Sequence, residues 1–392
     1  MSGANLTRAL PSQPFSQPGL NAIIAVAGTI MLTALAFAVW TQDGGNWRLA
    51  ALVLVGAGIG AALLRSSFGF AGAFRALVQD GDATGFQAHA VMIALASLLM
   101  LPMLAQGSIL GVPMRGEATP VGIGFAVGAI MFGAGMQIGG GCASGTLFSL
   151  GGGNGKLIGT VVGFVFGSAL GAWSMGFWWS LPALPGANLQ GLIGFGPAIA
   201  LQLTVLAGLF ALARHGSKSM LSQGLLMGGI ALALLNAATM FLAGKPWGET
   251  SAFALWGSKI FTSIGIDAHH WAYWMRPGFT TQIDGSLSFD VTSLMDMAIL
   301  LGAAMAAAFA GQFQPRWGGG VRPWAGALLG GIAMGYGARL ANGCNIGAYF
   351  SALSVGNLSG WAWMLLALAG SWIGIKLRPF FGLDTKADGP TC

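Results

Sequence analysis

The stretch GAIMFGAGMQIGGGCASGTLFSL at residues 128–150 returns 202 residues later as GGIAMGYGARLANGCNIGAYFSA at 330–352. The two stretches align without a gap and share one cysteine, five glycines, an isoleucine, a phenylalanine and a serine. In each, a glycine-spaced apolar run ends in a short polar break that contains the cysteine. A repeat of this length predicts that the fold is built from two related halves.

The composition around this repeat is that of a membrane protein. Of the 392 residues, 55% are hydrophobic and only 7% are charged, and the mean hydropathy is +0.73. Soluble domains carry roughly a quarter charged residues. Such a chain cannot cover itself with a surface compatible with water, so its main surroundings are expected to be a lipid bilayer.

Ten apolar runs are long enough to cross a bilayer. They lie near 21–41, 48–64, 87–106, 120–140, 157–178, 190–213, 221–243, 293–311, 324–341 and 359–377. The interrupted stretches 66–79 and 251–265 are too short or too broken to cross, and we expect them to be re-entrant and buried in protein. The sequence therefore predicts an all-α polytopic protein of nine to eleven spans.

The two copies of the repeat are expected to be inverted. Five spans separate the helix before Cys142 from the helix before Cys344, and an odd number reverses the direction of the chain. Inverted halves with broken helices build their binding sites around a central constriction. The expected division is a polar tail at 1–20, a first half at 21–189 with the Cys142 loop, a second half at 190–380 with the Cys344 loop, and a tail at 381–392.

The basic residues between the runs predict an orientation and not a nucleic-acid partner, although the net charge is +6. With a cytoplasmic N-terminus, the basic residues on the cytoplasmic side are Arg8, Arg65, Arg75, Lys156, Arg214, Lys218, Arg316, Arg322, Lys376, Arg378 and Lys386. The opposite side then has Arg48, Arg115, Lys245, Lys259 and Arg276. We therefore expect a protein of the bacterial inner membrane with both termini on the cytoplasmic side.

The cysteine loops have the features of an anion path. The small residues Gly141 and Gly343, beside the cysteines, allow a solute to approach the main chain. Free N–H groups at the start of a short following helix favour an anion. A thiol is a weak, polarizable donor that can hold a sulfur anion briefly and still release it. Buried cysteines also occur as simple packing residues, but two at matching repeat positions favour a functional role.

Other residues near the breaks are candidates with open alternatives. Arg339 is costly at membrane depth, so it either attracts the anion or bonds the carbonyls of a broken helix. Its repeat partner is Gln137. Asn342 and Asn345 flank Cys344 and either line the path or cap a helix. The three cysteines and four histidines have no metal-ligand spacing, so neither a metal nor a cofactor is expected; Cys392, in the polar tail, is expected to have no role.

At these residues the sequence resembles the YeeE/YedE family of sulfur-transport membrane proteins. The resemblance rests on GARLANGCNIGAYF at 337–350, on GGGCASG at 139–145 and on the two-half layout. It implies an hourglass-shaped protein whose tandem cysteines, here Cys142 and Cys344, pass thiosulfate by transient thiol contacts. Members can have a further cysteine before an AFR segment, where this chain has Gly69. A cytoplasmic partner resembling TusA or rhodanese, which are sulfurtransferases, is also implied.

We therefore expect a thiosulfate uptake permease and not an enzyme. Two negative charges moving inward cost about 4.6 kcal/mol at 100 mV, so either protons accompany the anion or a sulfurtransferase consumes it. One alternative is a transporter or channel for another sulfur or selenium species or a small neutral solute. Another is a membrane thiol oxidoreductase, which would need the Cα atoms of Cys142 and Cys344 roughly 4.4–6.8 Å apart.

Overall fold

The computed structural model describes residues 18–42, 44–217 and 219–383. Helix α1 already begins at Pro18, inside the stretch expected to be a tail, because proline is well suited to a first helical turn. Residues 1–17 and 384–392, which hold most of the two predicted tails and Cys392, lie outside the described residues.

The chain is an all-α, multi-pass membrane protein. Nine helical segments of the described ranges are long and apolar enough to cross a membrane. They are α1 (Pro18–Gln42), α2 (Trp47–Ser66), α4 (Thr84–Gln106), α5 (Ile123–Ile138) together with the short helix after it, α7 (Leu157–Trp179), α9 (Phe195–His215), α10 (Gln223–Ala243), α13 (Val291–Phe309) and α16 (Ser359–Leu377). The tenth expected run, 324–341, forms α14 (Val321–Leu340), which is as long as α2 and also contains two arginines but is less apolar because it has fewer leucine, isoleucine and valine residues.

Four short helical pieces lie among the long helices. They are α3 (Phe70–Asp80), α6 (Ala143–Gly151), α11 (Thr250–Ser263) and the π-helical segment η3 (Asn345–Ser351), which continues into α15 (Ala352–Ser354). At 1.5 Å per residue, even α11 extends only about 21 Å, which is less than the roughly 30 Å of a bilayer core. The prediction that 66–79 and 251–265 are too short to cross is confirmed.

The remaining elements connect these helices at their ends. They are α8 (Leu189–Ile193), α12 (Thr280–Asp284), the 3-10 turns η1 (Ala268–His270), η2 (Leu287–Phe289) and η4 (Arg378–Phe381), and the antiparallel strand pairs β1 (Ser108–Ile109) with β2 (Val112–Pro113) and β3 (Val121–Gly122) with β4 (Ala183–Leu184). The expected run 190–213 is broken at Gly194, whose φ of 79° separates α8 from α9. The expected run 120–140 begins as helix only at Ile123 because the two residues before it form β3.

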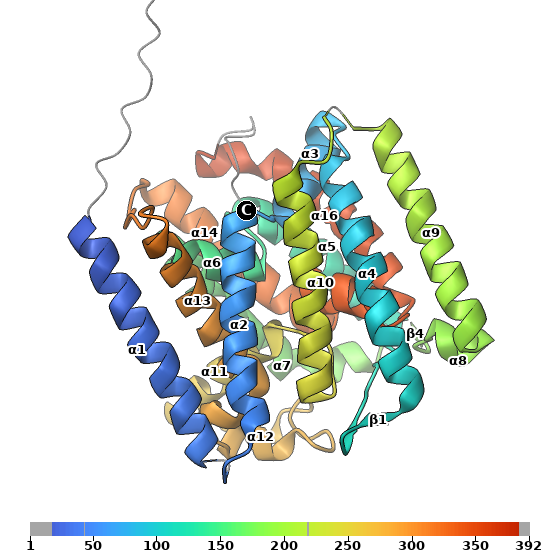
Figure 1. The fold of residues 1–392 in the computed structure, drawn as a ribbon, viewed down its shortest axis with the longest axis horizontal. Coiled ribbons are helices and arrows are strands. Elements are labelled where there is room, and N and C mark those ends of the chain that lie inside the picture. The colour runs from blue at the N-terminus through green and yellow to red at the C-terminus, as the bar shows by residue number, and fades with distance from the viewer. Residues whose placement is uncertain (1–17, 43, 218, 384–392) are drawn as a thin grey trace, which may run out of the picture.

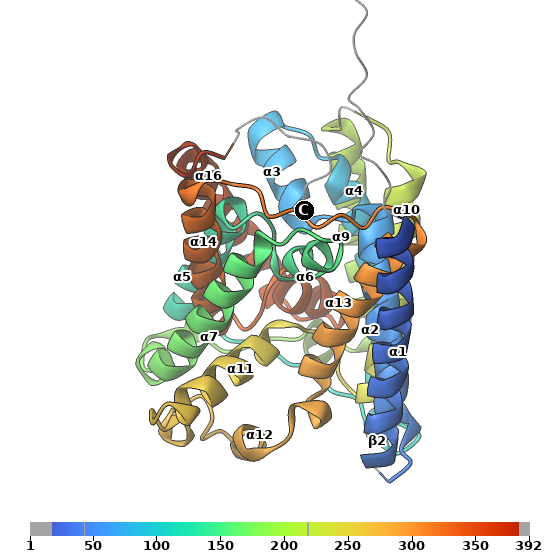
Figure 2. The same cartoon turned by 90° about the vertical axis from the view of Figure 1, so that its left-hand side faces the viewer.

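The two repeats interlock. Helix α14 of the second repeat packs on α7 of the first, and α16 of the second packs on α5 of the first. The short pieces also pack on the opposite half: α6 of the first half lies against α13 of the second, and α15 of the second half lies against α4 of the first. Figures 1 and 2 show α6 in the middle of the molecule, enclosed by these long helices.

Glycine permits the central crossing, between α5 and α14. A Cβ on Gly128 would lie 2.6 Å from the carbonyl oxygen of Gly337, and one on Gly135 would lie 2.7 Å from that of Gly330. The partners are in reverse order along the chain, so the two helices cross antiparallel with their backbones in contact. Under the repeat offset of 202 residues, Gly128 corresponds to Gly330 and Gly135 to Gly337, so the two contacts are equivalent to each other.

The outer helix pairs have matching contacts as well. A Cβ on Gly167 of α7 would meet the carbonyl oxygen of Ile332, and one on Gly370 of α16 would meet that of Ile130. Ile130 and Ile332 are equivalent under the same offset. These matched contacts support a two-fold relation between the halves, whose inversion across a bilayer stays a prediction.

The described ends of the chain lie at the same end of the bundle. Both views place the start of α1 and the end of α16 near the top of the molecule (Figures 1 and 2). Two termini on one side agree with an even number of crossings. That this side faces the cytoplasm stays a prediction.

Replacing Gly128 by alanine is expected to destabilise the protein by about 1–3 kcal/mol, because the new Cβ would overpack the crossing of α5 and α14. Thermal unfolding of purified protein in detergent measures the effect. Gly208 of α9 is the matched control, since a Cβ there would meet nothing within 4 Å. Equal unfolding temperatures for G128A and G208A would contradict the close crossing.

Candidate functional site

Cys142 is placed by a sharp reversal after α5. Gly140 adopts a φ of 87°, and the chain then starts α6 with Cys142 as its N-cap. The Cys142 Sγ accepts a hydrogen bond from the N–H of Gly145 at 3.4 Å and lies 3.3 Å from the Ser144 hydroxyl. Gly141, beside it, is buried, and the thiol is only 1% exposed.

Cys344 occupies the equivalent place in the second repeat. Gly343 has a φ of 146°, and a Cβ there would lie 2.8 Å from the nitrogen of Ala348, so the position requires glycine. Cys344 is the N-cap of η3, and its Sγ accepts from the N–H of Ile346 at 3.4 Å. Each predicted cysteine therefore begins a short helical segment.

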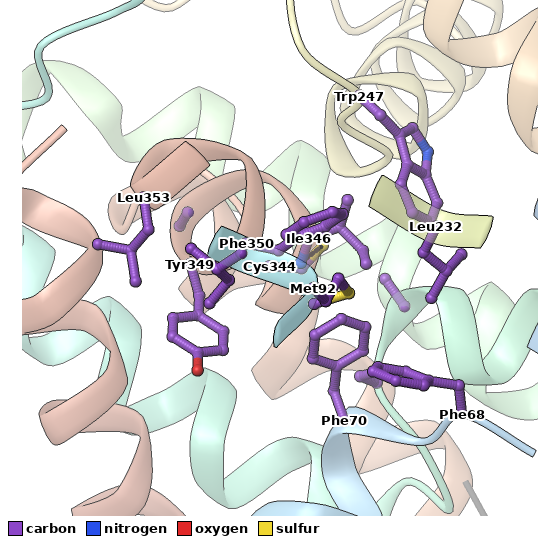
Figure 3. Packing of buried hydrophobic residues seen from close by; sticks show 14 of the residues in the cluster. Phe68, Phe70, Met92, Leu232, Trp247, Cys344, Ile346, Tyr349, Phe350 and Leu353 are labelled. Atoms are coloured by element: carbon purple, nitrogen blue, oxygen red, sulfur yellow. Dashed lines mark hydrogen bonds between the residues drawn. The ribbon is translucent and has the colours of Figure 1, made fainter. Parts of the chain in front are cut away.

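Both thiols belong to one buried cluster of side chains at the centre of the bundle. In Figure 3, Cys344 lies beside Ile346, with Met92 of α4, Phe70 of α3 and Trp247 around them. Cys344 is also only 1% exposed. The structure is therefore closed to solvent at both cysteines.

A third helix terminus reaches the same region. Gly69, where the resemblance places a further cysteine, is the N-cap of α3, and the backbone amide of Ala71 interacts with the Cys142 thiol. The Gln137 amide donates to the carbonyl of Ala71 at 3.2 Å and to the Ser371 hydroxyl at 3.3 Å. Gln137 thus holds the start of α3 against the first cysteine loop through these hydrogen bonds.

The two predicted asparagines have different surroundings. Asn345 is fully buried, and its side-chain Oδ1 and Nδ2 have no hydrogen-bond partner among the described residues. Asn342 is exposed, has a φ of 56° and donates to the Thr119 hydroxyl at 3.0 Å. Only Asn345 therefore lies in the buried centre with Cys344.

Arg339 bonds side chains of the second half and not helix carbonyls. Its guanidinium donates to the Tyr273 hydroxyl and to the Thr250 hydroxyl, each at 2.6 Å. Thr250 is the first residue of α11. The arginine, only 7% exposed, therefore fixes the start of this short helix.

The sequence analysis missed two buried acids. Glu249, the N-cap of α11, accepts a hydrogen bond from the Cys344 thiol at 3.7 Å. Asp296 of α13 is 1% exposed, and neither of its carboxyl oxygens has a partner among the described residues. A lone acid inside an apolar run is a functional candidate by default, so the run 293–311 contained the signal for Asp296. No local pattern marks Glu249, which folding alone brings to the cysteine.

Glu249 changes the electrostatics of the thiol site. One further negative charge at about 5 Å from an ionised carboxylate costs about 3 kcal/mol at an effective dielectric constant of 20. Neither Glu249 nor Asp296 forms an ion pair with a described residue. An anion at Cys344 is therefore favoured when this carboxyl is neutral and disfavoured when it is ionised.

The loop before Glu249 is held by a buried hydrogen-bond network. The Asn236 side chain accepts a hydrogen bond from the backbone N–H of Trp247 at 2.8 Å and donates one to the Ser351 hydroxyl at 3.1 Å. Ser351 in turn donates to the Trp247 carbonyl at 2.6 Å. This network ties α10 and η3 to the segment that carries the carboxyl.

Comparison with known proteins identifies the family of this fold. The model of the sulphur transport family matches residues 65–373, which include both cysteines and all four short helical pieces. The chain belongs to the sulphur transport family. Among its relatives, the probable transporter YedE of Escherichia coli (strain K12) is 29% identical over 159 residues, which are 40% of this chain and 39% of that protein.

Two further relatives match parts of the chain. The probable transporter YedE of Salmonella typhimurium is 30% identical over 159 residues, again 40% of this chain and 39% of that protein. The thiosulfate transporter TsuA of Spirochaeta thermophila is 37% identical over 76 residues, 19% of this chain and 23% of that protein. The matches thus span about two fifths or less of each relative. All these names indicate transport and not catalysis.

In this member of the sulphur transport family, replacing Arg339 by methionine is expected to loosen the start of α11 and to expose Cys344 more often. Hydrogen bonds to charged groups are each worth about 1.5–3 kcal/mol, so alkylation of Cys344 should accelerate at least about tenfold. Mass spectrometry of the labelled peptide measures the rate.

Two further variants grade and control this measurement. Tyr273→Phe removes one of the two hydrogen bonds and should have a smaller effect. Arg322→Met, at the exposed start of α14, should have none. Equal alkylation rates for R339M and R322M would show that Arg339 does not hold α11 in place.

Proposed function

We propose that this protein moves thiosulfate inward across the bacterial inner membrane, with Cys142 and Cys344 contacting the anion in turn. The observation that carries the proposal is the pair of repeat-related thiols. Each begins a short helical segment, and both lie in one buried core of a member of the sulphur transport family. The relative TsuA is a thiosulfate transporter, which supports the choice of anion.

The helix termini supply attraction without a lysine or arginine side chain in contact with the thiols. The N–H groups at the starts of α3 and α6 surround Cys142, and the partial positive charge there favours an anion. The thiol adds a weak, polarizable contact to the terminal sulfur of thiosulfate. Binding of this strength permits release to the next site.

Asn345 supplies a second kind of contact. Its buried amide has both a donor and an acceptor without partners, an arrangement that costs free energy unless something binds there. In our proposal this amide binds the oxygens of the anion at Cys344. Because both thiols are closed to solvent, transport also requires a movement that opens the core on each side in turn.

A cytoplasmic sulfurtransferase related to TusA or rhodanese remains our proposal for the partner that consumes the imported sulfur. Consumption at the cytoplasmic side would keep the internal thiosulfate concentration low. A low internal concentration offsets part of the electrical cost of moving a dianion inward.

Cys142→Ala and Cys344→Ala are each expected to lower the initial rate of labelled thiosulfate uptake at least about tenfold, equivalent to about 1.4 kcal/mol of lost stabilisation. The assay uses a sulfur-starved host that lacks other uptake routes for sulfur. Cys392→Ala serves as the cysteine control and should retain the wild-type rate. The proposal would be refuted if the variant with both Cys142→Ala and Cys344→Ala took up thiosulfate at the wild-type rate at equal membrane expression.

The same assay tests the anion. Unlabelled thiosulfate should compete fully for uptake, whereas equal concentrations of sulfate, sulfite or selenite should compete weakly. Stronger competition by one of these than by thiosulfate would assign the transporter to that anion.

A further inference from the structure

The two acids that were not predicted from the sequence interact electrostatically with each other, and one of them, Glu249, contacts the second thiol. Helix α11 packs on α13, and the Ser251 hydroxyl donates to that of Thr292 at 3.0 Å, which joins the first turns of the two helices. Asp296 is four residues after Thr292 and therefore lies on the same face of α13. Glu249 is two residues before Ser251. The fold thus brings two carboxyls from different helices to the same place.

Burial makes this pair unusual. Both side chains are 1% exposed, and three of their four carboxyl oxygens have no hydrogen-bond partner among the described residues. The fourth, Glu249 Oε2, accepts only from the Cys344 thiol. A buried carboxylate without a cation or several donors is strongly disfavoured, whereas the protonated acid is tolerated.

We propose that Glu249 and Asp296 form a proton-binding pair that couples proton entry to anion transport at Cys344. This inference rests on the proposed function and names the ion that drives it. With Glu249 protonated, its O–H can donate to an anion at the thiol, and with Glu249 ionised, like charge repels that anion. Binding of the proton and of the anion therefore favour each other, and this mutual preference is the condition for coupled transport.

The pair also fits the charge of the substrate. Two carboxyls can carry up to two protons, which matches the two negative charges of thiosulfate. The other titratable or charged groups near the pair are Cys344, Cys142, Arg339 and Asp290. Asp290 is about 9 Å from Asp296 along the axis of α13 and caps the start of that helix, so it lies between the pair and the end of the bundle.

The test uses full-length protein in liposomes with the membrane potential clamped at zero. An acid-outside gradient of one pH unit should make the wild type accumulate thiosulfate inside about tenfold for one proton or about a hundredfold for two, because each unit is a factor of ten per proton. Glu249→Gln should lose this accumulation, and Asp296→Asn should lower it about tenfold, by the factor for the proton that Asp296 carries. Asp296→Asn should still exchange labelled for unlabelled thiosulfate at a rate within about threefold of wild type.

Asp290→Asn is the matched control, because asparagine also caps a helix; this variant should accumulate thiosulfate like the wild type.

Wild-type protein that equilibrates thiosulfate but never accumulates it with the pH gradient would overturn the coupling while leaving the proposed function intact. Accumulation by D296N equal to wild type would also overturn it. Accumulation driven by a sodium gradient at equal pH, and not by the pH gradient, would assign the pair to a metal cation instead. Absence of any thiosulfate flux would instead refute the proposed function.

Discussion

The close backbone contact between α5 and α14 is the constraint on which the rest of the structure depends. Glycines at 128, 135, 330 and 337 allow the two helices to touch, and any side chain at Gly128 or Gly135 would collide with a carbonyl of the other helix. Each helix ends at a cysteine loop. Because the helices cross antiparallel, the two loops begin at opposite ends of the crossing, and the chain after each helix brings its cysteine into one buried core, although 202 residues separate the two cysteines in the sequence.

This core is closed to solvent and contains several polar groups. Its thiols contact helix N-termini and one carboxyl, and the neighbouring arginine, Arg339, is bonded to hydroxyl groups. A lysine or arginine at the thiols would bind an anion tightly and release it slowly. In the proposed function, partial charges at helix ends, a polarizable sulfur and the Asn345 amide, which has no partner among the described residues, provide weaker attraction. Protonation of Glu249 would then decide when an anion can bind at Cys344.

The sequence predicted these features as far as they are local. The repeat located Cys142 and Cys344, and the broken apolar runs predicted α3 and α11 as short helices. Asn342 and Asn345 looked equivalent because both flank Cys344. The left-handed turn at Asn342 places that residue at the surface, which spacing does not reveal. Glu249 reaches the thiol only through long-range packing of α11 on α7, α13 and α14, so local pattern carries no sign of it.

The most direct test of the central claim is protection of the thiols by their proposed ligand. Purified protein is treated with N-ethylmaleimide in thiosulfate or in equal sulfate, and the labelling of each cysteine is followed by mass spectrometry. Thiosulfate at ten times its dissociation constant should slow the labelling of both Cys142 and Cys344 about tenfold and leave Cys392 unchanged. Equal labelling of either buried cysteine in thiosulfate and in sulfate would contradict the account.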